Sequence, residues 1–379
     1  MALTNHEQFL EAAGRGQKIL IALPHAAGID EIGAGLSLAA HLKSMGKSVD
    51  IVSDGYSAKA EHKLFSGADA IRPTLGALQH FVISVPVQNI KLENIAYTIA
   101  GDELRIMLTP QAENWSAEHV RAEATPYRYD LAITVGAQDM DALGAVYRSA
   151  PDFWRTVPIL NIDHSPANER FGAVNVVDMK ATAVSEIVYD LLREKHPDSV
   201  QGTSATALLA GVIGKTRNFK TDNVSPKTLT IAADLVTRGA ERERIVGELY
   251  RNKNIETLRL WGRALVRLRT DSEQKLAWTL LTRQDFVSAG AKEEELTGIV
   301  EDLLGASPDI ALSCVLYEGQ DNIVHGILHT HQGTDVFAIA NDWKPVGSPR
   351  QVLFSLPAGT ALVDAERLVL EKIRKGEKE

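Results

Sequence analysis

The chain has 379 residues, of which 45% are hydrophobic and 23% are charged, and its formal net charge is −9. This length and this ordinary globular composition leave room for two domains with sizeable cores. The negative balance argues against binding of a nucleic acid by bulk charge alone, although a local basic cleft is compatible with it.

Cysteine content and hydropathy both indicate a reducing, aqueous compartment. The chain has one cysteine, Cys314, which excludes a disulfide framework or a thiolate zinc cluster. It lies in the apolar run 310–316, so we predict a packed core thiol rather than a nucleophile. No apolar run reaches the roughly 18 residues of a membrane span, and the N-terminus lacks a signal-peptide profile. We therefore expect a soluble, cytoplasmic protein without a membrane partner.

The first half of the chain alternates predicted strands and helices. Apolar segments at 18–23 and 49–53 predict strands on either side of an apolar-faced helix at 34–45. This spacing is typical of parallel, doubly wound sheets. The apolar runs 131–135 and 157–162 predict further parallel strands, because strands buried on both faces lack polar alternation. The expected fold class is α/β, with a doubly wound and mostly parallel sheet.

Between these strands lies a segment of different character. Three alternating or apolar runs, 81–87, 95–99 and 104–109, are joined by short polar turns. Such a pattern is typical of a hairpin or β-meander. We predict a β-hairpin insertion near 85–125.

The second half is mainly helical at first and then mixed. A long helix is predicted at 254–269, and shorter helices and strands follow it to the C-terminus. We expect a first domain at 1–265, a linker at 266–275 and a smaller α/β domain at 276–379.

The strand predicted at 157–162 ends in Asp163 and His164, followed by Ser165 and a proline. Binding sites of open α/β sheets form where such strands end. An aspartate and a histidine at that edge indicate a contact to a metal ion or a phosphate.

Four segments carry a resemblance to a known family. The segments 24–33, 133–144, 158–165 and 211–219 read PHAAGIDEIG, ITVGAQDMDALG, PILNIDHS and GVIGKTRNF. Together they resemble the motifs of the DHH phosphoesterases that carry a DHH-associated (DHHA1) substrate domain. Active members of that family include oligoribonuclease/pAp phosphatases and RecJ-like exonucleases.

The resemblance implies a two-metal hydrolase with altered ligands. Members of the family hold two divalent cations, typically manganese, through aspartate and histidine. In this sequence, three of the expected aspartate positions are occupied by Gly28, Gly136 and Lys215. Loss of carboxylates lowers affinity for oxygen-ligated divalent ions. We therefore expect no cofactor and no efficient two-metal catalysis.

Part of the metal-binding set remains. Asp30, Asp163 and His164 match family positions, and His25 lies one residue out of register. If the site is still active, these residues would hold at most one Mn²⁺ or Mg²⁺, with Asp163 and His164 as the catalytic residues. Alternatively, Asp30 caps the helix that follows it.

Lys215 is the sharpest departure from the family. A lysine cannot ligate a cation, so we predict that its ammonium pairs with Asp30 or Asp163. The expected contacts to a substrate phosphate are Ser165, Lys215 and Arg217, with His329 and Arg350 from the second domain.

Three classes of function follow. The first is a protein with a degraded two-metal site that binds a nucleotide or a short RNA or DNA end. The second is a divergent metal-dependent phosphodiesterase acting on short oligoribonucleotides or nucleotides. The third is an interaction scaffold that uses the insertion at 85–125 for a protein partner, with a homodimer as a further expectation.

Overall fold

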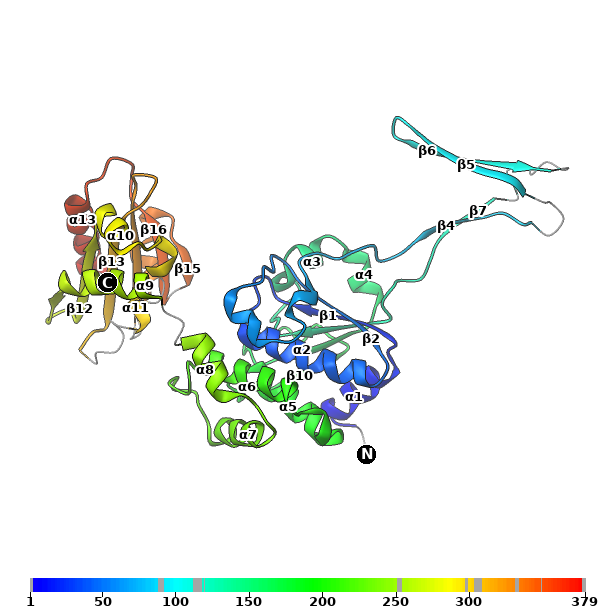
Figure 1. The fold of residues 1–379 in the computed structure, drawn as a ribbon, viewed down its shortest axis with the longest axis horizontal. Helices are drawn as coiled ribbons and strands as arrows, with labels where there is room; N and C mark the ends of the chain where they lie inside the picture. Colours follow the sequence, from blue (N-terminus) through cyan, green and yellow to red (C-terminus); the bar gives the residue numbers. More distant parts are fainter. Residues whose placement is uncertain are drawn as a thin grey trace. The chain divides into compact units, whose positions relative to one another are not determined.

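The computed structural model describes residues 3–87, 92–111, 118, 120–250, 254–296, 299–302, 309–330, 334–348 and 350–376. The chain divides into two compact units, Met1–Arg251 and Asn252–Glu379, and both appear in Figure 1. Each has its own sheet and core.

The first unit is built on a parallel sheet. Among the described residues this sheet has six strands in the order β10-β9-β8-β1-β2-β3, and every neighbouring pair is parallel. The strands are β1 (Lys18–Leu23), β2 (Ser48–Ser53), β3 (Ile71–Arg72), β8 (Leu131–Val135), β9 (Ile159–Asp163) and β10 (Val174–Val177). The chain runs outward from β1 in one direction and from β8 in the other, so the sheet has a topological switch point between β1 and β8. The predicted fold class is confirmed.

Helices cover both faces of this sheet. They are α1 (Asn5–Arg15), α2 (Ile29–Ser44), α3 (Ala145–Arg148), α4 (Pro151–Thr156), α5 (Val184–Lys195), α6 (Thr203–Lys215), α7 (Pro226–Thr237) and α8 (Arg242–Tyr250), with 3₁₀ turns η1 (Ala60–Leu64), η2 (Ala68–Ala70), η4 (Asp141–Leu143) and η5 (Pro197–Ser199). Alternate residues of β1 pack into the two helix layers, one on each face of the sheet. Ile19 and Ile21 pack with the apolar residues of α2, α5 and α6, whereas Leu20 packs with Phe153 and Trp154 of α4. Successive strand residues point to opposite faces, which produces this division.

A glycine permits the close packing of α2 on α6. A Cβ at Gly33 would lie 2.3 Å from the carbonyl oxygen of Ala207. Any larger residue would therefore push these two helices apart. The start of α2 and the end of α6 both contribute side chains to the site described below.

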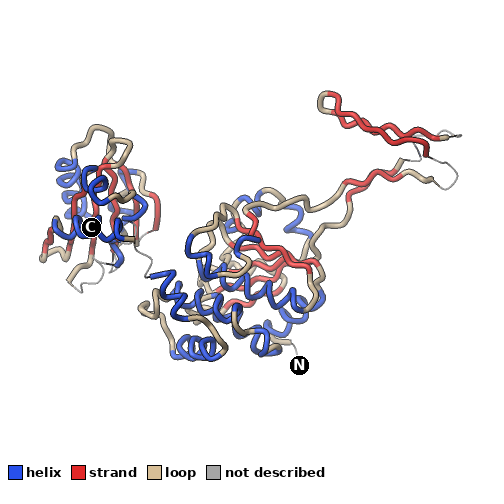
Figure 2. The backbone as a smooth tube through the Cα atoms, in the orientation of Figure 1, coloured by secondary structure: helices blue, strands red, loops and turns tan. Residues whose placement is uncertain are grey.

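The insertion forms two antiparallel ribbons, drawn as strands in Figure 2. One pairs β4 (Phe81–Ser84) with β7 (Arg121–Ala124), and the other pairs β5 (Leu92–Ala100) with β6 (Glu103–Pro110). The β5–β6 turn contains Gly101, whose φ of 63° favours glycine. Residues 88–91, 112–117 and 119 of the predicted insertion lie outside the described part of the chain.

The second unit has a mixed sheet. In the described segments its order is β11-β12-β13-β14-β16-β15, and β12 and β13 are the parallel pair. Its strands are β11 (Arg269–Asp271), β12 (Leu276–Leu281), β13 (Leu312–Glu318), β14 (Val324–Thr330), β15 (Val346–Ser348) and β16 (Gln351–Ser355). Its helices are α9 (Ile255–Val266), α10 (Arg283–Ala289), α11 (Ile299–Asp302), α12 (Val336–Ile339) and α13 (Leu362–Gly376), with 3₁₀ turns η6 (Glu293–Leu296) and η8 (Asn341–Trp343).

The division between the units lies earlier than the linker expected at 266–275. It falls between Arg251 and Asn252, because α9 belongs to the second core. Leu260 and Trp261 of α9 pack with Leu281 at the end of β12. Residues 269–271 of the expected linker form β11, which pairs with β12.

The single cysteine is a core residue, as predicted. Cys314 on β13 is buried, and burial raises the pKa of its thiol to about 12. A thiol with such a pKa is not a nucleophile near neutral pH. None of the helices in the described part of the chain is both long and apolar enough to cross a membrane.

Candidate functional site

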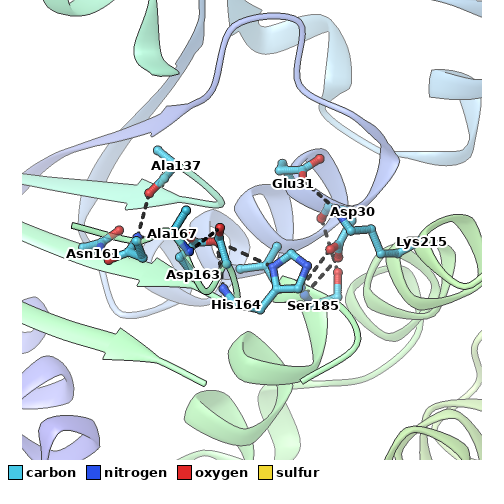
Figure 3. Close-up of polar contacts among 12 residues, drawn as sticks. Asp30, Glu31, Ala137, Asn161, Asp163, His164, Ala167, Ser185 and Lys215 are labelled. Carbon is cyan, nitrogen blue, oxygen red and sulfur yellow. Dashed lines mark hydrogen bonds and ion pairs between the residues drawn. The ribbon is translucent and has the colours of Figure 1, made fainter. Parts of the chain in front are cut away.

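A cavity of about 550 Å³ lies at the carboxyl edge of the parallel sheet. Its lining includes Gly136 and Asp163 at the ends of β8 and β9, the adjacent His164 and Ser165, Glu31 from α2 and Lys215 from α6. All of these residues belong to the first unit. The cavity is next to the topological switch point, where open α/β sheets bind ligands. Figure 3 shows the polar contacts around it.

Asp163 is held by the loop that follows it. Its side chain is buried, and its Oδ1 accepts a hydrogen bond of 2.7 Å from the His164 amide. Its Oδ2 accepts another, 2.8 Å long, from the side-chain amide of Asn168. Burial tends to raise the pKa of Asp163, but the hydrogen bonds outweigh burial and hold the pKa below its usual value. The carboxylate is therefore ionised at neutral pH and fixes the loop 163–168.

His164 lies beside this carboxylate and lines the cavity. Its Nδ1 is 3.5 Å from Asp163 Oδ1, which is within ion-pair range but longer than a normal hydrogen bond. The side chain is 17% exposed. Ser165 also lines the cavity, and its Oγ accepts a hydrogen bond from the amide of Ala167. Asp163, His164 and Ser165 thus all line the cavity, and their predicted roles stay predictions.

Asp30 has a different position from the one predicted for a metal ligand. It is buried, and its carboxylate accepts hydrogen bonds of 2.8 Å from the Val184 amide and 3.0 Å from the Ser185 amide. These amides form the first turn of α5, where backbone donors lack helical partners. Asp30 therefore caps α5. The alternative of a cap was the better prediction, although the capped helix is not the one that contains Asp30.

Glu31 is the carboxylate that faces the cavity from α2. Its Oε1 is 3.7 Å from Nζ of Lys215, and its Oε2 accepts a hydrogen bond of 3.0 Å from the amide of Gly28. Burial is the main cause of a raised pKa at Glu31, with the nearby charge of Asp30 acting in the same direction and Lys215 against it. Sequence reasoning missed this residue, since it precedes the matched Ile32 and Gly33 without matching a family position itself.

The predicted partner of Lys215 was therefore wrong. The lysine lies in the cavity as expected, but its ion pair is with Glu31 rather than with Asp30 or Asp163. The reason is that the two aspartates are already occupied by backbone and amide donors. The Lys215 side chain is 40% exposed, so the pair is screened by water and contributes at most about 1 kcal/mol.

Gly136 is in a conformation and a space that only glycine fits. Its φ is 77°, and a Cβ there would lie 2.5 Å from Cγ of Glu31. The side chain of Glu31 therefore occupies the room that a residue at 136 would need. An aspartate at this position cannot coexist with the observed Glu31 rotamer.

His25 pairs with a residue outside this cavity lining. Its side chain is 61% exposed, and its Nδ1 is 3.1 Å from Oδ2 of Asp54, which follows β2. The same oxygen accepts a hydrogen bond of 2.8 Å from the Ala145 amide. That amide and His25 lower the pKa of Asp54. Asp54 could have been noticed in the sequence, because it directly follows an apolar strand.

Arg217 follows the end of α6 and is exposed. It begins a run of three residues with positive φ, namely 49° at Arg217, 60° at Asn218 and 64° at Phe219. Such backbone strain in residues other than glycine is uncommon and clusters at functional sites. The strained turn begins two residues after Lys215.

His329 and Arg350 belong to the second unit. His329 is a buried residue of β14, opposite Ser313 of β13 and Gln351 of β16. Arg350 is exposed in the turn before β16, and its carbonyl accepts a hydrogen bond from the Thr330 amide. Their predicted role in phosphate binding stays a prediction.

The side chains present do not fit a two-metal centre. Within the described residues, no group of three or more His, Cys, Asp and Glu side chains is arranged to hold a metal ion. Asp30 faces α5, His25 faces Asp54, and Lys215 brings a positive charge to the cavity.

Comparisons with known proteins found a similar solved fold and similar sequences. The computed fold matches the crystal structure of an exopolyphosphatase-related protein from Bacteroides fragilis with a TM-score of 0.71 at 15% identity, covering 99% of this chain and 96% of that one. In sequence, the bifunctional oligoribonuclease and PAP phosphatase NrnA of Bacillus subtilis is 26% identical over 150 residues, 39% of this chain and 48% of that protein. The chain is similar to proteins of the DHH/DHHA1 family.

A second NrnA, from Thermus thermophilus, is 34% identical to this chain over 93 residues, which are 24% of this chain and 28% of that protein. The matched parts thus span about half or less of the length of these relatives. No protein-family model matches the sequence. The resemblance predicted from the four motifs is confirmed, and with it the DHH/DHHA1 fold.

Proposed function

We propose that this DHH/DHHA1 protein binds the phosphate of a nucleotide, or of a short RNA or DNA end, without efficient two-metal hydrolysis. The observation that carries the proposal is the ion pair between Lys215 and Glu31 in the cavity at the switch point. The resemblance implies that this ammonium group replaces a metal-binding aspartate. The names of the NrnA relatives, which act on oligoribonucleotides and PAP, suggest the class of ligand.

The chemistry of the cavity suits an anion. Lys215 is 40% exposed, so its ammonium is accessible to a phosphate oxygen. The Ser165 hydroxyl and the His164 ring line the same cavity and supply further hydrogen-bond donors. Glu31 competes with the ligand for Lys215, because the approaching phosphate must replace one negative partner by another. Its raised pKa lowers this competition, since the carboxylate takes up a proton more readily than an exposed glutamate.

This competition gives two substitutions with opposite effects on affinity. We expect Lys215→Ala to weaken binding of pAp about 10-fold to 100-fold, the value of one charge-assisted hydrogen bond. We expect Glu31→Gln to strengthen binding, because it leaves Lys215 without its anionic partner while keeping an oxygen that can accept from Gly28. Isothermal titration calorimetry with pAp and with a short oligoribonucleotide measures both effects.

Two controls test whether the change in affinity is specific to the cavity and whether the Lys215→Ala variant stays folded. Lys220→Ala removes an exposed lysine that follows the turn 217–219. Because Lys220 does not line the cavity, this change should leave the affinity for pAp unchanged. Thermal unfolding of Lys215→Ala should differ little from the wild type, because a screened pair contributes at most about 1 kcal/mol. Equal affinity of the wild type, Lys215→Ala and Glu31→Gln would contradict the proposed site.

A further inference from the structure

The β5–β6 ribbon has one entirely apolar face. Direct cross-strand partners in an antiparallel pair lie on the same face. Three alternate pairs, Ile95 with Leu108, Tyr97 with Ile106 and Ile99 with Leu104, therefore form one face.

The intervening pairs form the other face, and apart from Met107 their residues are polar or small. They are Asn94 with Thr109, Ala96 with Met107, Thr98 with Arg105 and Ala100 with Glu103. This face also holds an ion pair of 2.8 Å between Arg105 and Glu103. The ribbon is thus amphipathic, and the charged residues Arg105 and Glu103 mark the face that suits contact with water.

The apolar face is exposed in the single chain. Tyr97 is 72% exposed and Ile99 is 74% exposed, and Ile95, Leu104 and Ile106 are exposed as well. A two-stranded ribbon is marginally stable in water unless a hydrophobic face is covered. A contiguous apolar patch of this kind marks an interaction surface.

We propose that this face packs against the same face of a second copy of the chain. The six side chains carry no charge, so two identical faces meet without repulsion between like charges, which a two-fold interface requires. At roughly 100 Å² for each large apolar side chain, each copy buries on the order of 600 Å². The pair then buries about 1,200 Å², which reaches the lower bound of a stable interface.

The expected arrangement is a small sandwich of four strands. Two ribbons packed face to face interdigitate their apolar side chains and give the hairpins the core that each lacks alone. The polar faces with Arg105 and Glu103 then point outward. This proposal does not depend on the phosphate site, because none of the ribbon residues lines that cavity.

Sedimentation equilibrium of the full chain tests the proposal. We expect a dimer for the wild type and a monomer for Ile99→Glu, which places a charge on the apolar face next to Tyr97 and Leu104. Thr98→Glu is the matched control, since it adds the same charge to the neighbouring residue on the opposite face and should remain dimeric. A monomeric wild type at tens of micromolar, or a dimeric Ile99→Glu, would overturn the proposal.

Cross-linking gives a second test that does not require a destabilising change. The only native cysteine, Cys314, is buried, so a single engineered thiol on the ribbon reports on contact between copies. Under mild oxidation Ile106→Cys should form a disulfide-linked dimer, whereas Thr98→Cys should stay monomeric on a denaturing gel. Equal cross-linking of both variants would show that the apolar face is not the interface. A hairpin that folds back onto its own chain would give no cross-link and would also overturn the proposal.

Discussion

Replacing Asp30 with alanine should lower the free energy of unfolding by about 2–5 kcal/mol, because two buried amide donors lose their acceptor. The amides of Val184 and Ser185 donate to this carboxylate at 2.8 Å and 3.0 Å, and no solvent reaches the site, since the Asp30 side chain is buried. The contact joins α2 to α5 across 154 residues of chain. Urea denaturation measures the loss directly.

The matched control is Asp152→Ala. Asp152 is likewise an aspartate in the first turn of a helix, but its side chain is 84% exposed. It shares any favourable interaction with the helix dipole and lacks the buried acceptor role, so its removal should cost less than about 1 kcal/mol. If Asp30→Ala were as mild as Asp152→Ala, the cap on α5 would not be a stabilising contact, and Asp30 would again be available to a ligand.

Gly136→Asp should destabilise the chain by about 2–4 kcal/mol, although it restores the family residue. A residue with a side chain at φ 77° is strained by about 1–3 kcal/mol. In addition, its Cβ would lie 2.5 Å from Cγ of Glu31, so Glu31 must move and give up its bond to the amide of Gly28. Thermal and urea unfolding measure the effect, and manganese should not reverse it.

Two further variants separate backbone strain from the clash with Glu31. Gly46→Asp introduces the same side chain at a φ of 79° with nothing within 4 Å of the new Cβ, so it reports the strain alone. The double variant Glu31→Ala/Gly136→Asp removes the clash and should recover part of the loss. Equal costs at 46 and 136, without recovery in the double variant, would mean that Glu31 does not occupy the space beside Gly136.

Much of the fold could be predicted because its signals are local. The apolar runs that became β1, β2, β8 and β9 are bounded by turn residues, and their burial on both faces erases polar alternation. The Asp163-His164 pair at the end of β9 was visible for the same reason, since the edge of a parallel sheet is fixed once the strand is known. The alternating residues of β5 and β6 likewise indicated a ribbon.

The contacts that distinguish this site could not be predicted because they join distant parts of the chain. Local spacing does not reveal that Asp30 accepts hydrogen bonds from the amides of Val184 and Ser185. It also does not reveal that Lys215 pairs with Glu31. Helix α9 was placed almost entirely in the first domain, because its amphipathic pattern does not say which core it covers. Its partners on β12 come from another segment.

The most direct test of the central claim is the manganese stoichiometry and turnover of the purified chain. After equilibration with excess Mn²⁺ and removal of unbound ion, we expect well under two ions per chain by elemental analysis, and near-background release of phosphate from pAp or of mononucleotides from a short oligoribonucleotide. Two tightly bound ions, together with robust manganese-dependent turnover that disappears in Asp163→Ala, would contradict the account and establish a divergent metal-dependent phosphoesterase.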